Sequence, residues 1–333
     1  MAEFFQEGTS GAELDLVRQE KGIDTLKSHF QQLLKSNRKK AIELINDQNL
    51  NFCTLYILHT AIVRSGNARF LNNHNFNALR MAYSISEKRT KDIDLCIKNQ
   101  NKPASEILKY IVCTGYTEDG LDNRYDEILE LAAALLIRYY NDDTVLPVVS
   151  DMIFKRYKKG ALIHNLVWAF FEARNPDSLL LLAHHLYSQD RKDYELACRL
   201  LGFIPYVESN RYTNNAKMYY EVSQWIQENS MFLYHTEECL HLTANPIPYV
   251  LSAEAKYLCK PVSPNDGKPF RDFSDDEEML LNQFKALDAG TRMQLAGFSY
   301  MLYRRNMHQW NEWIHFPIHD QLRTMKMAMG GRM

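Results

Sequence analysis

The sequence contains few residues that interrupt helices. It also lacks apolar runs long enough to cross a membrane. Only 10 prolines and 13 glycines occur in 333 residues, and most of them separate periodic segments. All-β chains need many more turn residues, so this scarcity favours helices over sheets. Apolar runs such as Leu166–Phe171 are far too short to span a bilayer. The first residues also lack the basic and apolar regions of a signal peptide, so we expect a cytoplasmic protein.

Paired cysteines and a dominant charge are missing as well. The 6 cysteines are scattered singly, with no C-x-x-C pair. This pattern indicates reduced thiols in a reducing compartment and not a disulfide framework. The formal net charge is −2, which gives no overall attraction to nucleic acid. A local basic face is still compatible with that balance.

Motifs of known catalytic chemistry are also absent. The sequence has no G-x-S-x-G elbow and no H-E-x-x-H metal pair. The segment Gly8–Gly11 lacks the lysine and the preceding strand of a phosphate-binding loop. The sequence therefore identifies no catalytic residue, predicts no cofactor, and favours a non-enzymatic protein.

Helical periodicity is the main signal that is present. In the stretch from Ala161 to Pro205, Ile163, Leu166 and Phe170 begin an apolar stripe with a 3.6-residue period. Further helices are expected to begin roughly every 15 to 20 residues, a spacing typical of two-helix repeats. Connections this short force neighbouring helices to run antiparallel. We predict an all-α fold in which helical hairpins stack as a curved, solenoid-like array of the HEAT or TPR kind, with a less regular C-terminal quarter.

Composition divides the chain into four regions. Prolines are concentrated between positions 246 and 269, and Asn265-Asp266-Gly267 is a turn signal, so irregular structure is expected there. Ser274-Asp275-Asp276-Glu277 then matches a capping box that opens a helix. The predicted regions are a mobile N-terminal arm at 1–11, a helical-repeat-like domain at 12–230, an irregular proline-rich region at 231–273, and C-terminal helices with a methionine-rich basic tail at 274–333.

Two basic clusters are candidates for binding nucleic acid. Both lie at expected helix ends, where lysine and arginine also favour the helix dipole and solvent. An array of helices could nevertheless align such clusters along a groove and neutralise several phosphates. The candidate residues are Lys35, Arg38, Lys39, Lys40, Lys155, Arg156, Lys158 and Lys159.

A metal site is the weaker alternative. His235 and Cys239 are four residues apart and would share a helix face, with His241 and Cys259 nearby in sequence. Zinc ligands usually occur as C-x-x-C or H-x-x-x-H pairs, which are absent from this segment, so a helix end with ordinary polar residues is the preferred interpretation. A metal-dependent enzyme centred on residues 235–259 stays open as an alternative function.

The C-terminal tail is the least ordinary segment of the sequence. Methionine adapts to irregular surfaces and tryptophan anchors interfaces, so the tail is a candidate for binding a partner. The other interpretation is a terminal helix that covers the array. The candidate residues are Trp310, Trp313, Met325, Met327 and Met329. From architecture and the missing motifs we expect an interaction scaffold or a structural component of a larger assembly, with a protein partner or self-assembly.

Overall fold

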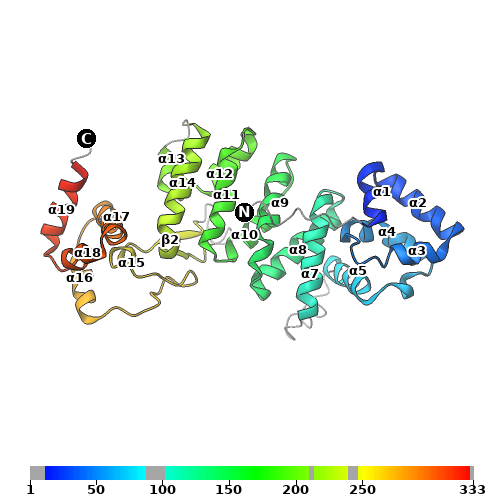
Figure 1. Ribbon diagram of the computed structural model, residues 1–333, viewed down its shortest axis with the longest axis horizontal. Helices are drawn as coiled ribbons and strands as arrows, with labels where there is room; N and C mark the ends of the chain where they lie inside the picture. Colours follow the sequence, from blue (N-terminus) through cyan, green and yellow to red (C-terminus); the bar gives the residue numbers. More distant parts are fainter. Residues whose placement is uncertain (1–11, 88–101, 210–213, 239–246, 331–333) are drawn as a thin grey trace. The chain divides into compact units, whose positions relative to one another are not determined.

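The computed structural model describes residues 12–87, 102–209, 214–238 and 247–330, and the chain forms two compact units (Figure 1). The first unit ends at Ala173 and the second begins at Arg174. The predicted mobile arm at 1–11 lies outside the described residues. The predicted divisions at 230 and 273 both fall inside the second unit and stay predictions.

The first unit consists of helices joined by short turns. Asn37, Asn72 and Asp122 begin α3, α5 and α8 by accepting a hydrogen bond from a backbone N–H of the first turn. Three short 3-10 helices lie between the longer elements, at Ala68–Phe70, Tyr116–Glu118 (η2) and Asp143–Val145. The α-helices are α1 (Glu13–Lys21), α2 (Ile23–Ser36), α3 (Arg38–Leu44), α4 (Phe52–Arg64), α5 (Asn73–Ser86), α7 (Lys102–Gly115), α8 (Asn123–Tyr140), α9 (Leu146–Lys158) and α10 (His164–Glu172).

The core of the first unit forms where α4, α7 and α8 meet. The rings of Phe52 and Tyr125 stack with their centroids 6.0 Å apart. The Tyr125 hydroxyl donates a hydrogen bond of 2.8 Å to the carbonyl oxygen of Gly115. Tyr125 is completely buried, so this bond satisfies a polar group that would otherwise be costly to bury. The aromatic core therefore fixes the position of α4, which carries much of the candidate site described below.

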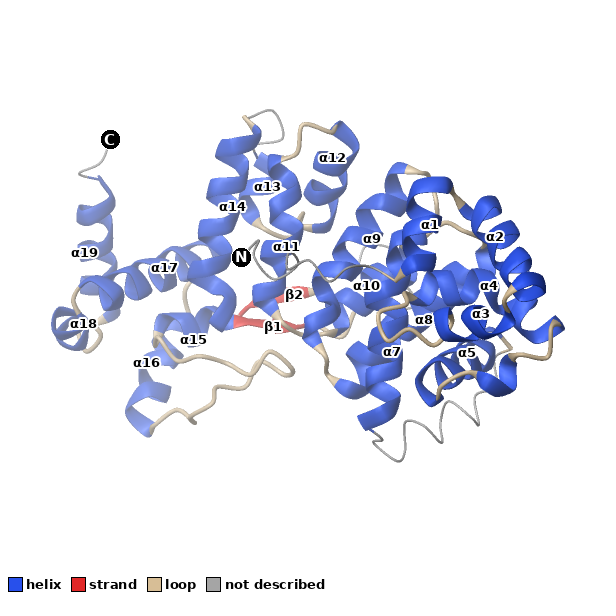
Figure 2. Ribbon diagram, turned by 45° about the vertical axis from the view of Figure 1, so that its right-hand side comes forward, coloured by secondary structure: helices blue, strands red, loops and turns tan. Residues whose placement is uncertain are grey.

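The second unit is also mainly helical, with one small sheet (Figure 2). Strands β1 (Leu233–His235) and β2 (Tyr249–Leu251) pair antiparallel, with Tyr234 opposite Val250. Shorter 3-10 helices occur at Pro176–Ser178, His185–Tyr187 and Ser230–Phe232. The α-helices are α11 (Leu179–His184), α12 (Arg191–Leu200), α13 (Pro205–Ser209), α14 (Asn215–Asn229), α15 (Ala253–Tyr257), α16 (Asp275–Lys285), α17 (Ala289–Arg305), α18 (Met307–Trp313) and α19 (Ile318–Gly330).

One aromatic cluster holds the last five helices together. The rings of Tyr257 and Phe284 stack at a centroid distance of 4.4 Å. Trp313 packs edge-on against Phe298 at 5.4 Å. Met325 of α19 is buried in the same cluster. The C-terminal helices are therefore part of the core of the second unit.

The structure confirms the expectation of an all-α protein and leaves finer features as predictions. Both units are built mainly from helices, and only β1 and β2 form a ladder among the described residues. No helix in the described ranges has both the length and the apolar character needed to cross a membrane. The solenoid-like stacking and the cytoplasmic location stay predictions.

Candidate nucleic-acid interface

A groove runs between α2 and α4 in the first unit and has a volume of about 580 Å³. Lys27, Gln31 and Leu34 line it from α2, at spacings of four and three residues. These spacings place the three side chains on one face of the helix. Thr60 and Arg64 line the opposite wall from α4, also four residues apart. One face of each helix thus forms a wall of the groove.

Basic side chains dominate the charge of this groove. Lys27 and Arg64 are exposed, and Arg124 stands at the adjoining start of α8. Among the residues that the structure describes, no carboxylate lies within ion-pair distance of these three cations. Asp122 is the one acidic residue in the lining, and its carboxylate caps α8 by accepting from the backbone N–H of Tyr125 at 2.8 Å. The groove therefore has an excess of positive charge at neutral pH.

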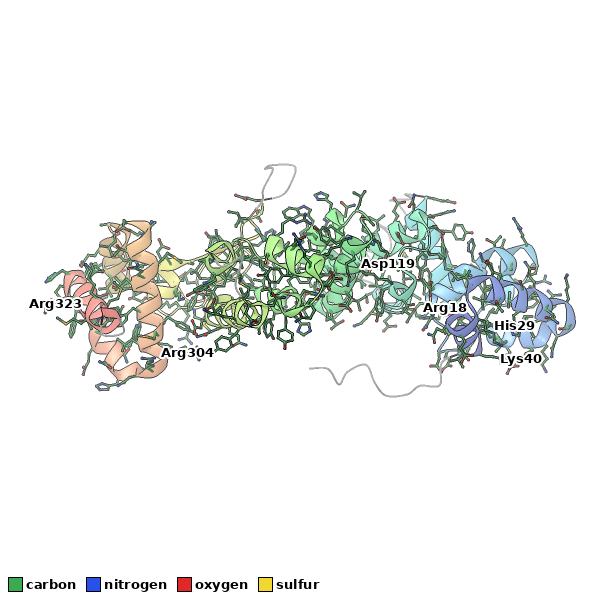
Figure 3. All side chains as sticks on the ribbon, turned by 90° about the horizontal axis from the view of Figure 1, so that it is seen from above. Arg18, His29, Lys40, Asp119, Arg304 and Arg323 are labelled. Atoms are coloured by element: carbon green, nitrogen blue, oxygen red, sulfur yellow. The ribbon has the colours of Figure 1, made fainter. Side chains whose placement is uncertain are left out.

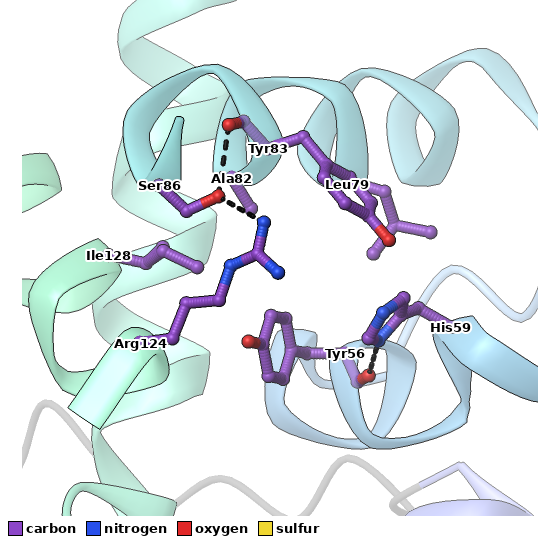
Figure 4. A pocket seen from close by; sticks show the side chains of 8 residues that line it. All are labelled: Tyr56, His59, Leu79, Ala82, Tyr83, Ser86, Arg124 and Ile128. Carbon is purple, nitrogen blue, oxygen red and sulfur yellow. Dashed lines mark hydrogen bonds between the residues drawn. The ribbon is translucent and has the colours of Figure 1, made fainter. Parts of the chain in front are cut away.

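Aromatic rings continue the groove into a small recess between α4, α5 and α8 (Figure 4). The Arg124 guanidinium lies 5.3 Å from the ring centroid of Tyr83 and donates a hydrogen bond of 2.8 Å to Ser86. His59 packs edge-on against Tyr83 at 5.6 Å and contacts Tyr56 at 5.1 Å. Tyr56 and His59 line both the recess and the groove. Cations and rings are thus adjacent along one surface.

The hydroxyl of Tyr56 stays protonated in this environment. Burial, with a smaller contribution from the charge of Asp122, raises the pKa of Tyr56 to about 12. Ionisation therefore adds no negative charge to the groove near neutral pH. A protonated phenol can donate a hydrogen bond to a phosphate oxygen.

The first predicted basic cluster lies beside this groove. Lys35 lies in the last turn of α2, eight residues after Lys27. Arg38 is already occupied, because its Nη2 donates to Asn67 Oδ1 at 2.7 Å. The Lys40 ammonium lies 3.4 Å from the carboxylate of Glu13, whereas Lys39 is exposed. None of the four residues of this cluster lines the groove itself, and Lys35 is the exposed member on the helix that forms one of its walls.

The second predicted cluster mainly fastens α9 to the 3-10 helix η2 and its flanking residues. Arg156 is buried, donates to both carboxylate oxygens of Asp119 at 2.7–3.0 Å, and reaches Glu130 at 2.9 Å. Two lysines hold the same segment. Lys155 donates a hydrogen bond of 3.1 Å to the Thr117 carbonyl oxygen, and Lys159 donates one of 3.2 Å to the Asp119 carbonyl oxygen. Arg18 and Asp119, two buried charged residues of the first unit, are labelled in Figure 3. Lys158 remains exposed, so the charges of the other three serve the fold.

The proposed metal ligands are only partly described. Cys239 and His241 lie outside the described residues. His235 is buried in β1 and accepts a hydrogen bond from the Glu237 N–H at 3.1 Å. Burial raises the pKa of the Cys259 thiol to about 12, which disfavours the thiolate that binds metals. Within the described ranges, no three histidine, cysteine or acidic side chains are grouped to hold a metal ion.

Two of the five predicted partner-binding residues of the tail lie in the core. Trp313 and Met325 are each 2 % exposed, and the half-buried Trp310 donates from Nε1 to Ser299 at 2.8 Å. Met327 is exposed, and the side chain of Met329 lies outside the described residues. The terminal helix thus contributes Met325 to the core of the second unit, and partner binding by the tail stays a prediction.

Four residues of the groove and its adjoining recess were not recognised from the sequence. Lys27, His59, Arg64 and Arg124 come from α2, α4 and α8 and share no motif. The basic residues Lys27 and Lys35, eight positions apart on one helix, are the signal that was available. The other three become neighbours only when the helices pack.

Comparisons with known proteins give one partial similarity. No family model matches the sequence, and no solved structure matches the fold. An alignment 161 positions long, which covers 40% of this chain, is 28% identical to a probable ATP-dependent helicase of Methanocaldococcus jannaschii. The match spans 20% of that helicase, so the chain corresponds to about a fifth of it.

This similarity corrects the function expected from the sequence. We expected a non-enzymatic interaction scaffold or a structural component of an assembly, because the architecture is helical and catalytic motifs are missing. The similar protein is named as an enzyme, which contradicts that expectation. The inference was wrong because a helical architecture by itself is compatible with many functions.

Proposed function

We propose that this protein binds single-stranded nucleic acid in the groove between α2 and α4, as the strand-holding part of an ATP-dependent helicase-type enzyme. One observation carries this proposal. The groove, with Lys27 and Arg64, and the recess, with Arg124, share the rings of Tyr56 and His59. Proteins that hold single strands combine a positively charged groove with aromatic side chains on which bases stack. The partial similarity to a probable helicase supports the same function.

The sequence bears on which of the two functions, strand binding or ATP hydrolysis, these residues perform. ATP hydrolysis by a phosphate-binding loop needs a G-x-x-x-x-G-K-[ST] motif, and these 333 residues contain none. We therefore assign strand binding, and not ATP hydrolysis by such a loop, to these residues. We also propose that the helices continue the solenoid-like stacking that their spacing predicts, supported by the contacts of α8 with both α7 and α10.

Fluorescence anisotropy of a labelled oligothymidine, titrated with the full chain, tests the groove. With about three phosphates neutralised, log Kd should change with log salt with a slope of about 2 between roughly 50 and 200 mM KCl. Single strands should bind more tightly than a duplex of the same length, because a duplex hides its base faces. Equal affinity for duplex would contradict the proposed stacking.

A charge-reversal variant locates the binding surface. Lys27→Glu combined with Arg64→Glu should weaken binding by about tenfold or more, since both side chains are solvent-exposed and line the groove. Lys285→Glu is the matched control, because Lys285 is an exposed lysine of α16 in the second unit. Equal binding by the groove variant and the control would rule out this groove as the interface.

A further inference from the structure

The second unit contains a cleft of about 600 Å³ between α14, α15 and α17. Lys256 of α15 and Arg304 and Arg305 of α17 line this cleft, together with Trp225 and Glu228 of α14. Figure 3 labels Arg304 on its helix. The volume lies within the range of about 300–1,000 Å³ that holds small ligands.

The three cations of this cleft lack acidic partners. Lys256 is only 8% exposed, and its ammonium donates to the neutral amide oxygen of Asn229 at 2.6 Å. In the part of the chain that the structure covers, no carboxylate comes within ion-pair distance of Lys256, Arg304 or Arg305. Burial of an ammonium is unfavourable and lowers the pKa of Lys256, and the charge of Glu228 in the same cleft acts in the opposite direction. An anionic ligand would add negative charge beside the three cations.

Aromatic and acidic groups stand next to these cations. Lys256 Nζ lies 5.7 Å and Arg304 Cζ lies 5.9 Å from the centroid of the Tyr300 ring. The two cations are therefore close to the same ring. Trp225 adds a half-buried indole to the lining. Glu228 accepts a hydrogen bond from Gln224 at 2.9 Å. Carboxylates of this kind bind the hydroxyl groups of a ribose in dinucleotide-binding proteins.

We propose that this cleft binds a nucleotide. The phosphates lie against Lys256, Arg304 and Arg305, the base stacks on Trp225, and Glu228 accepts from the ribose. The chemistry is shared by a free nucleotide and by the phosphorylated end of a strand. The inference concerns a different unit and a different ligand from the groove between α2 and α4, and it does not depend on that groove.

Gly297 offers a direct way to block the cleft. It lines both the cleft and an apolar recess of about 410 Å³ formed with Met293, Met301 and Ala328. A Cβ atom added at Gly297 meets no heavy atom within 4 Å. Gly297→Leu therefore fills the opening without a clash at its first carbon, whereas Gly297→Ala leaves most of the space free.

Isothermal titration calorimetry of the full chain with ADP tests the proposal. The unmodified protein and Gly297→Ala should bind ADP, and Gly297→Leu should lose binding while its melting temperature is retained. Arg304→Ala combined with Arg305→Ala should weaken binding by about tenfold or more. The groove variant Lys27→Glu/Arg64→Glu should bind ADP normally. Loss of ADP binding and loss of oligothymidine binding can therefore be told apart, and each tests a separate proposal.

Ligand fragments decide which part of the proposal holds. Inorganic pyrophosphate and adenosine should each bind more weakly than ADP, because each offers only half of the contacts. A 5′-phosphorylated oligonucleotide that binds more tightly than ADP would identify a strand end as the source of the nucleotide. Absent ADP binding, binding retained by Gly297→Leu, or pyrophosphate binding equal to that of ADP would each overturn the assignment.

Discussion

Gly115 and Gly297 are two glycines in helices whose surroundings differ completely. A Cβ atom at Gly115 would lie 2.7 Å from Leu129 Cδ2 and 2.8 Å from the Tyr125 hydroxyl. Contacts this short force the packed core of the first unit to shift. Gly297 faces open space, so there the absence of a side chain serves no packing purpose and leaves a cleft unobstructed.

Alanine substitutions at these two glycines should change stability in opposite directions. Gly115→Ala should lower the free energy of unfolding by about 1–3 kcal/mol, because the core is overpacked. Gly297→Ala should raise it by up to about 1 kcal/mol, because alanine favours the helix. Urea denaturation of both variants measures the difference. Two changes of the same sign would show that the packing around one of them is not as described.

At the scale of elements, helix α16 shows local chemistry that could be predicted from the sequence. The Ser274-to-Glu277 pattern predicts a capping box, and both of its hydrogen bonds are present. Glu277 also forms an ion pair of 2.6 Å with Lys260. Burial acts in the opposite direction, but the hydrogen bonds from Lys260 and from the Ser274 backbone N–H lower the pKa of Glu277.

The pH dependence of stability should reveal this ion pair. A carboxylate with a lowered pKa stabilises the fold above its unfolded pKa and loses that contribution as pH falls through its folded pKa, below about 4.5. Glu277→Gln keeps a residue that can complete the capping box and removes the charge. It should cost up to about 1 kcal/mol at pH 7 and little at pH 3. Thermal unfolding across pH checks this, and an equal loss at both values would indicate that the charge contributes nothing.

Elements were otherwise predicted with uneven success. Asp122 and Asp190 cap the starts of α8 and α12, and caps of this kind are local signals in the sequence. The strands β1 and β2 have three residues each, too few to show an alternating pattern. The methionines and tryptophans of the tail suggested a surface, yet Trp313 and Met325 pack inside. Amino-acid composition does not determine which face of a helix packs against the rest of the chain.

At the scale of the whole molecule, the chain divides inside its most regular stretch. The helices α10, α11 and α12 follow one another closely in sequence, but α10 belongs to the first unit and the other two to the second. Each unit has its own aromatic cluster, around Tyr125 and around Tyr257. A domain is defined by such a core, so regular spacing along the sequence can continue across a domain boundary.

Residues 1–173 and 174–333 should therefore fold as separate polypeptides. Each should give a cooperative thermal transition by circular dichroism, since each buries its own aromatic core. The fragment 1–173 should retain oligothymidine binding, and the fragment 174–333 should retain ADP binding. The polypeptide 231–333 is the control. It should unfold without a sharp transition, because a cut at residue 230 separates α14 from β1 and α15. A stable C-terminal piece from that cut would favour the division first predicted.

The sequence by itself determined that this protein is helical and where many helices begin, because periodicity and capping depend on residues a few positions apart. It also excluded a phosphate-binding loop, which is a contiguous motif. Only the tertiary structure decided which charges are available. Arg156 is bound to Asp119 inside the first unit, whereas Arg64 and Arg124, 60 positions apart in sequence, line a groove and a recess that share Tyr56 and His59. Burial and partnership depend on contacts between distant residues, and these contacts separate the basic residues that hold the fold from those that can hold a ligand.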